Sequence, residues 1–225
     1  MTVHLLQALT ELRSKLLTLS SETEAQLVAA IDALIKRDMV LAQRVIAGDS
    51  TIDELEVELE EDCLKILALY QPVAQDLRFI VTALKINNDL ERIGDLAVNI
   101  AHRAIKLAEY PELQNEAFAN IEQMATKAKA MLRNCIIAFV DRSVDVAQRI
   151  LVDDQEINRL HVANFDAIER LLVSDPPLAK MYIAILSVSR YLERIGDQAK
   201  NIAEDVIYLI DGRIVRHGAS FVDES

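Results

Sequence analysis

Two pairs of carboxylates occur at equivalent places in a twelve-residue sequence that the chain contains twice. The copies read LERIGDLAVNIA and LERIGDQAKNIA, lie 102 residues apart and are identical at ten positions. Glu91 and Asp95 in the first copy, and Glu193 and Asp197 in the second, are four residues apart. On an α-helix this spacing puts both carboxylates on one face, where they repel each other unless a cation binds between them. The pairs therefore predict sites for divalent or trivalent metal ions.

Each copy also contains a glycine and an arginine that bear on this prediction. Gly94 and Gly196 weaken a helix by about 1 kcal/mol each relative to alanine, and they would allow a helix or a ligand to approach closely. Arg92 and Arg194 could instead pair with the aspartates three residues later on a solvated surface. The residues alone leave the metal site and the surface ion pairs open.

A third carboxylate pair precedes the first copy. In the segment IDELEVELEEDC, Glu56 and Glu60 are four residues apart and continue an apolar stripe through Cys63, so we expect them to border the core. If this helix packs antiparallel to the first copy, the pair would face Glu91 and Asp95. Four carboxylates from two helices would suit a hard metal ion.

The corresponding helix of the second half offers poorer ligands. The segment INRLHVANFDAIE places His161 and Phe165 where the first half has Glu56 and Glu60. Because fewer anionic oxygens are present, we expect weaker binding of oxygen-loving metals at the second site.

The composition favours long helices over sheets. The 225 residues are 52% hydrophobic and include only five Gly and four Pro. The periodicity predicts a long first helix, a short helix ended by Gly48 in the left-handed conformation, a helix opened by GDST and a long helix to about Tyr110. The second half should repeat this plan, with helices over 112–140, over the short segment VAQRILVDD, from Asp154, and to about Asp211.

We therefore predict an all-α fold of two pseudo-symmetric three-helix bundles that arose by duplication. The first bundle should cover residues 1–110, and the second should cover residues 111–225 with a short C-terminal tail. One stripe of each repeated block should face the core. These residues are Leu90, Ile93, Ala97, Ile100, Leu192, Ile195, Ala199 and Ile202.

Charge and motif content exclude several classes of function. The formal net charge of −12 disfavours nucleic acid as a partner. No apolar run is long enough to insert into a membrane. The chain has no Glu-x-x-His pair, no glycine-rich phosphate loop and no zinc-type spacing of histidines, so an enzyme is not expected. Cys63 and Cys135 fit buried thiols of a cytoplasmic protein.

The two blocks, with QPVAQDLR at 71–78 and Arg-His at 216–217, resemble the PhoU family of bacterial phosphate-signalling regulators. The resemblance covers nearly the whole chain. It implies a cytoplasmic, commonly homodimeric regulator without enzymatic activity, which restrains phosphate uptake and keeps the phosphate regulon off when phosphate is plentiful. The implied partners are the ATPase subunit of the phosphate ABC importer and the sensor histidine kinase of the regulon, with the protein acting as their adaptor.

The resemblance also implies metal clusters on paired E(D)-x-x-x-D motifs, with iron, zinc, manganese or magnesium as candidate ions. The two block pairs, Glu91 with Asp95 and Glu193 with Asp197, match this motif. Glu56 and Glu60 resemble a facing pair with Glu in place of the final Asp. The rival interpretations are a metal store or metal-dependent enzyme unrelated to phosphate signalling, and a purely structural helical module.

Overall fold

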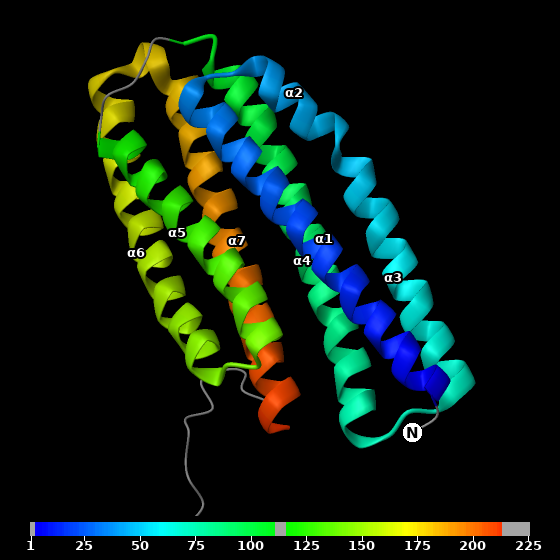
Figure 1. The fold of residues 1–225 in the computed structure, drawn as a ribbon. Coiled ribbons are helices and arrows are strands. Elements are labelled where there is room, and N and C mark those ends of the chain that lie inside the picture. The colour runs from blue at the N-terminus through cyan, green and yellow to red at the C-terminus, as the bar shows by residue number, and fades with distance from the viewer. Residues whose placement is uncertain (1–2, 111–115, 213–225) are drawn as a thin grey trace, which may run out of the picture.

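The structure, a computed structural model, describes residues 3–110 and 116–212 (Figure 1). All long elements of this part of the chain are helices, as predicted. They are α1 (Val3–Lys36), α2 (Met39–Ala47), α3 (Asp49–Tyr70), α4 (Ala74–Leu107), α5 (Glu116–Asp141), α6 (Val144–Ser174) and α7 (Ala179–Asp211), with a short 3-10 turn, η1 (Pro176–Leu178), before α7. The Arg-His pair at 216–217 lies outside the described residues.

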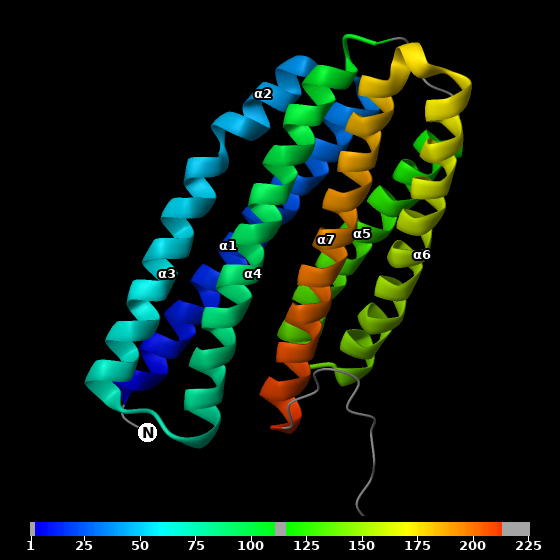
Figure 2. The same cartoon turned by 180° about the vertical axis from the view of Figure 1, so that it is seen from behind.

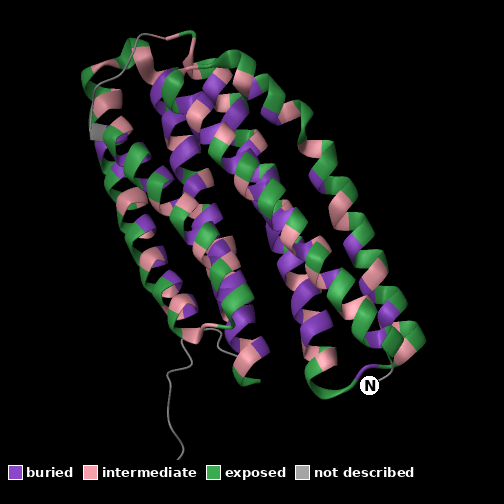
Figure 3. Ribbon diagram, viewed as in Figure 1, coloured by how far each residue is buried: buried purple, intermediate pink, exposed green. Residues whose placement is uncertain are grey.

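The helices form two bundles side by side. Helices α1 to α4 make the first bundle and α5 to α7 the second, with α4 against α7 and α1 against α5 at the junction (Figures 1 and 2). Buried residues follow the helix faces that turn toward neighbouring helices (Figure 3). The predicted pair of pseudo-symmetric bundles is confirmed, whereas the boundary at residue 110 stays a prediction because 111–115 are not described.

The duplication extends to details of the turns. Arg37 and Arg142, which directly follow α1 and α5, both adopt the left-handed conformation, with φ of 57° and 51°. The next residue in each case caps the following helix. Asp38 accepts hydrogen bonds from two backbone N–H groups of α2, and Ser143 accepts one from α6. The two halves therefore share their backbone path beyond the repeated block.

The halves differ after these turns, and two expectations for this region are wrong. The short segment VAQRILVDD and the helix expected from Asp154 form one continuous helix, α6. Gly48 has φ of −83°, which is right-handed, and it separates α2 from α3 at a visible bend (Figure 1). Asp153, its counterpart in α6, lacks the destabilising effect of glycine inside a helix, so the second half continues without a break.

All eight residues predicted to face the core from the repeated blocks are buried, and so are Cys63 and Cys135. A charged side chain also helps to join the two bundles. The guanidinium carbon of Arg13 lies 5.3 Å from the ring centre of Phe79 on α4 and 5.6 Å from that of Phe139 on α5. Cation–π attraction at these distances holds α1 to both helices.

The repeated glycines allow close packing of helices. A Cβ atom at Gly94 would lie 3.3 Å from Cδ1 of Ile52 on α3, and one at Gly196 would lie 3.3 Å from Cδ1 of Ile157 on α6. Larger side chains would push these helices apart. The glycines therefore bring α3 close to α4, and α6 close to α7. None of the described helices is long and apolar enough to cross a membrane.

Candidate metal centre

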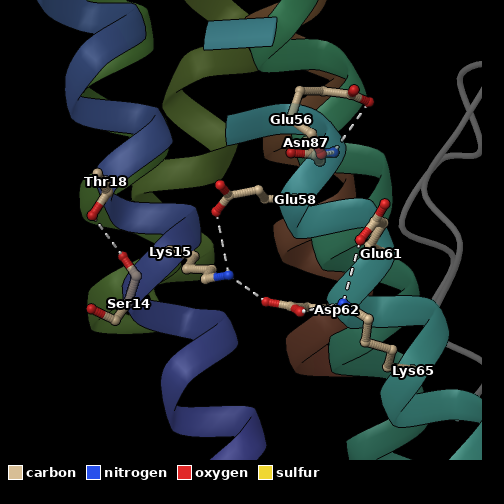
Figure 4. Close-up of polar contacts among 9 residues, drawn as sticks. All are labelled: Ser14, Lys15, Thr18, Glu56, Glu58, Glu61, Asp62, Lys65 and Asn87. Atoms are coloured by element: carbon tan, nitrogen blue, oxygen red, sulfur yellow. Dashed lines mark hydrogen bonds and ion pairs between the residues drawn. The ribbon is translucent and has the colours of Figure 1, made fainter. Parts of the chain in front are cut away.

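Helices α3 and α4 form an antiparallel hairpin that sets which carboxylates face each other. The register is marked by Asn87, whose Nδ2 donates to the backbone oxygen of Glu56 at 3.0 Å and to its Oε1 at 3.3 Å (Figure 4). One helical turn beyond Asn87, Glu91 comes into range of α3. The hairpin thus places Glu56 beside Glu91, as predicted.

Five carboxylates influence one another on these two helices. Burial raises the pKa of Glu91, and so do the negative charges of Asp95, Glu56 and Asp53. Burial also raises the pKa of Asp95, together with the charges of Asp49 and Asp53. We call these residues, Asp49, Asp53, Glu56, Glu91 and Asp95, the first acidic cluster. Glu56, Glu91 and Asp95 hold their protons more tightly than isolated side chains, because burial and the neighbouring carboxylates both disfavour their ionised forms and raise their pKa values.

Glu60 does not lie opposite the block as expected. Its side chain is exposed, and among the cluster carboxylates it raises the pKa of Glu56 alone. Asp49 and Asp53 occupy the facing position instead. A role of Glu60 as a metal ligand remains a prediction that the register does not favour.

A sequence signal for the two missed aspartates was present. Asp49 and Asp53 have the same four-residue spacing as the block carboxylates. Pro72 lies at the centre of the turn between α3 and α4, and Asp49 is as far before it as Asp95 is after it. Because an antiparallel hairpin pairs positions equidistant from its turn, this count places the two aspartates at the same level.

Surface ion pairs do not explain the first acidic cluster. Within the described residues none of its five carboxylates forms an ion pair with a lysine or arginine. The acidic run farther along α3 behaves differently. Lys15 Nζ lies 2.5 Å from Asp62 and 3.6 Å from Glu58, and Lys65 also pairs with Asp62 (Figure 4). Ion pairs with lysine therefore account for carboxylates at the far end of α3 but not for the first acidic cluster.

The second half contains a smaller group of carboxylates. Glu193 and Asp197 lie on α7, and the charge of Asp154 on α6 contributes to raising the pKa of both, after burial. Asp154 is buried, and its Oδ2 accepts from Lys200 Nζ at 3.2 Å. We call Asp154, Glu193 and Asp197 the second acidic cluster. Asp154 was not predicted, although it is the counterpart of Asp49 in the repeat.

The other facing positions of α6 carry neutral side chains. His161 Nδ1 lies 2.8 Å from Ser189 Oγ, in the place of the Glu56–Asn87 contact. Burial and the nearby charge of Arg190 lower the pKa of His161, so it is neutral at pH 7. Phe165 is exposed, and Asn158 stands where the first half has Asp53. The predicted inequality of the two sites thus has a structural basis.

The first acidic cluster fits a hard cation by the chemistry of its donors. Mg²⁺ and Mn²⁺ prefer carboxylate oxygens, and a cation would relieve the repulsion among these side chains. In the described residues no group of three or more Asp, Glu, His or Cys side chains is placed to hold a metal ion as it stands. Binding would therefore require the carboxylates to turn toward a shared ion.

The raised pKa values predict how the metal-free protein responds to pH. Ionising Glu91 and Asp95 costs more in the folded than in the unfolded chain, where their pKa values are about 4. Their contribution to the free energy of unfolding is therefore fully present below a pH of about 4, the unfolded pKa. It is lost as the pH rises through the raised pKa values of these two side chains in the folded protein. In a chelator, the free energy of unfolding relative to a Glu91→Gln, Asp95→Asn variant should fall from pH 4 to 7. A difference that is constant across this range in urea titrations would contradict the prediction.

Comparisons with known proteins cover almost the whole described region. The PhoU domain model matches residues 16–104 and 121–206. The phosphate-specific transport system accessory protein PhoU homolog of Pseudomonas putida is 38% identical over 93% of this chain and 81% of its own length. The homolog of the same name from Aquifex aeolicus is 38% identical over 95% of this chain and 96% of its own length.

Solved structures give the same result. The crystal structure of PhoU from Pseudomonas aeruginosa matches with a TM-score of 0.89 and 36% identity, over 92% of this chain and 99% of that one. The phosphate transport system regulatory protein PhoU from Streptococcus pneumoniae matches with a TM-score of 0.85 and 28% identity, over 95% and 100%. The similarity therefore includes both bundles and their relative arrangement.

Proposed function

Because this chain belongs to the PhoU family, we propose that it is a regulatory accessory protein of a phosphate transport system. The observation that carries the proposal is the match of the PhoU domain model to both halves of the chain. Relatives that align over most of their length are named as accessory or regulatory proteins of such systems, and none of those names describes an enzyme. We therefore assign a regulatory role without catalysis.

More specifically, the protein would act as an adaptor in the cytoplasm. It would restrain phosphate uptake and silence the phosphate regulon when phosphate is plentiful. Its partners would be the importer's ATPase subunit and the regulon's sensor histidine kinase, and it would act as a homodimer. The two joined bundles support this proposal, because each would offer its own helix faces to a different partner (Figure 1). In the part of the chain that the structure describes, the carboxylates at the start of α3 form no ion pair with a lysine or arginine, whereas those farther along α3 do. The start of α3 would therefore favour a partner with a basic docking surface.

A capture assay tests the adaptor role. Immobilised full-length chain should retain the purified ATPase subunit and the cytoplasmic part of the kinase, each alone and both together. An acidic helical bundle of unrelated sequence is the control, because it retains proteins by charge only. Retention of neither protein above this control, with and without phosphate, would rule out the adaptor.

The first acidic cluster supports metal binding as a second function of the same chain. Asp49, Asp53 and Glu56 would bind from α3, and Glu91 and Asp95 from α4. A bound ion would supply positive charge that joins the two helices. A metal store or a metal-dependent enzyme built on this cluster would bind the ion and neither protein partner. The capture assay therefore separates those rivals from a metal-stabilised regulator.

A further inference from the structure

We propose that the ammonium group of Lys200 is the permanent cation of the second acidic cluster, so that this half of the protein binds no metal ion. The chain would then be a one-site metal protein despite its duplicated motif. The inference concerns the second half and rests on the proposed metal site only for the contrast with the first half.

The contact geometry places the ammonium where a metal ion would have to bind. Lys200 follows Asp197 by one helical turn on α7, and its Nζ reaches across to Asp154 Oδ2 on α6 at 3.2 Å. Asp154 is 1% exposed, so its negative charge is almost completely removed from water. A buried carboxylate requires a nearby cation, and Lys200 forms the ion pair that meets this requirement.

The charge of Lys200 is maintained by its surroundings. Burial lowers its pKa, but the hydrogen bond to Asp154 and the charges of Asp154, Glu204 and Asp197 act in the opposite direction, and the pKa is raised overall. The side chain is therefore positively charged at neutral pH. A divalent ion approaching Asp154 and Asp197 would meet this positive charge directly.

The corresponding positions of the first half lack such a cation. Val98 is the counterpart of Lys200, one of the two differences between the repeated blocks. Asp49, the counterpart of Asp154, accepts a hydrogen bond at 3.2 Å from the neutral amide of Gln26. The first cluster thus has five carboxylates and no internal ammonium, whereas the second has three carboxylates and one.

The second cluster still contains the features of a cation site once Lys200 is removed. Oδ1 of Asp154 is buried beside Gly196 and has no hydrogen-bond partner in the described residues. Asp197 and Lys200 also line an open groove of about 790 Å³ between α4 and α7, so ions in solution can reach these two side chains. Removing the ammonium group should therefore leave the carboxylates of the second acidic cluster without a cation and able to bind a metal ion.

Exchange of the two counterpart residues tests the inference with Mn²⁺ as the probe. Full-length protein is freed of metal with a chelator, and bound Mn²⁺ is counted by electron paramagnetic resonance and by calorimetry. Wild-type protein should bind Mn²⁺ in the first half only. Lys200→Val should add binding in the second half that Asp154→Asn removes again, whereas Val98→Lys should weaken binding in the first half at least tenfold. Lys180→Val, at an exposed site on α7, is the matched control and should change nothing.

Each outcome is decisive for one half. If Lys200→Val binds no more Mn²⁺ than wild type, the inference is overturned while the first site stands. It is also overturned if Glu193→Gln with Asp197→Asn removes Mn²⁺ from wild-type protein. If wild type binds no Mn²⁺ but Lys200→Val does, the inference stands and the proposed first site fails. If circular dichroism shows that Lys200→Val does not fold, Lys200→Gln gives the same test. This change removes the charge but keeps a polar side chain.

Discussion

Removal of the gene for this chain should leave the phosphate regulon active in medium rich in phosphate and should raise phosphate uptake. Without the adaptor, the state of the importer would no longer reach the sensor kinase, and nothing would restrain the ATPase subunit. The expected change is large, because a regulon that is normally silent would be expressed constitutively. A regulon reporter and the initial rate of labelled phosphate uptake measure the two effects.

Complementation provides the control for this experiment. The wild-type chain supplied in trans should restore silence of the reporter and normal uptake. A chain carrying Glu91→Gln and Asp95→Asn shows whether the first acidic cluster contributes to signalling or only to stability. A deletion strain whose reporter stays silent in rich phosphate would contradict the regulatory role itself.

Addition of Mn²⁺ to the metal-free protein should raise its melting temperature. A ligand that binds only the folded state stabilises it by about 2.7 kcal/mol at a concentration of 100 times Kd. For a chain of this size that corresponds to roughly 5–10 °C. Glu91→Gln with Asp95→Asn should abolish most of the rise, because only three carboxylates of the first acidic cluster remain.

The same double change in the second half, Glu193→Gln with Asp197→Asn, should leave the rise unchanged, because Lys200 already neutralises the second acidic cluster. Both variants relieve repulsion between carboxylates, so neither should lower the melting temperature of the metal-free protein in a chelator. This baseline separates loss of a ligand from loss of structure. Equal losses in the two variants would refute the asymmetry, and a wild-type protein that never responds to metal would refute the metal site.

The sequence predicted the features of the fold that depend on periodicity along one helix. The core stripe of each block, with Leu90 and Leu192 at its start, is buried as expected, because apolar residues at three- and four-residue spacing fix which face turns inward. Periodicity also placed the long helices. Periodicity did not show that α6 continues past Asp153. The segments that follow α1 and α5 have the same helical pattern in both halves, and only Gly48 interrupts the helix in the first half.

The carboxylate spacing within each block, such as Glu91 with Asp95, was likewise decided by the sequence alone, since both residues lie on one helix. Which residues face each of these pairs was decided by tertiary structure. The turn around Pro72 sets the longitudinal register of α3 against α4, and this register selects Asp49 and Asp53 in place of Glu60. In the second half the packing of α6 on α7 buries Asp154 beside Lys200. Local periodicity cannot specify such pairs, because they depend on how far one helix is displaced along its neighbour.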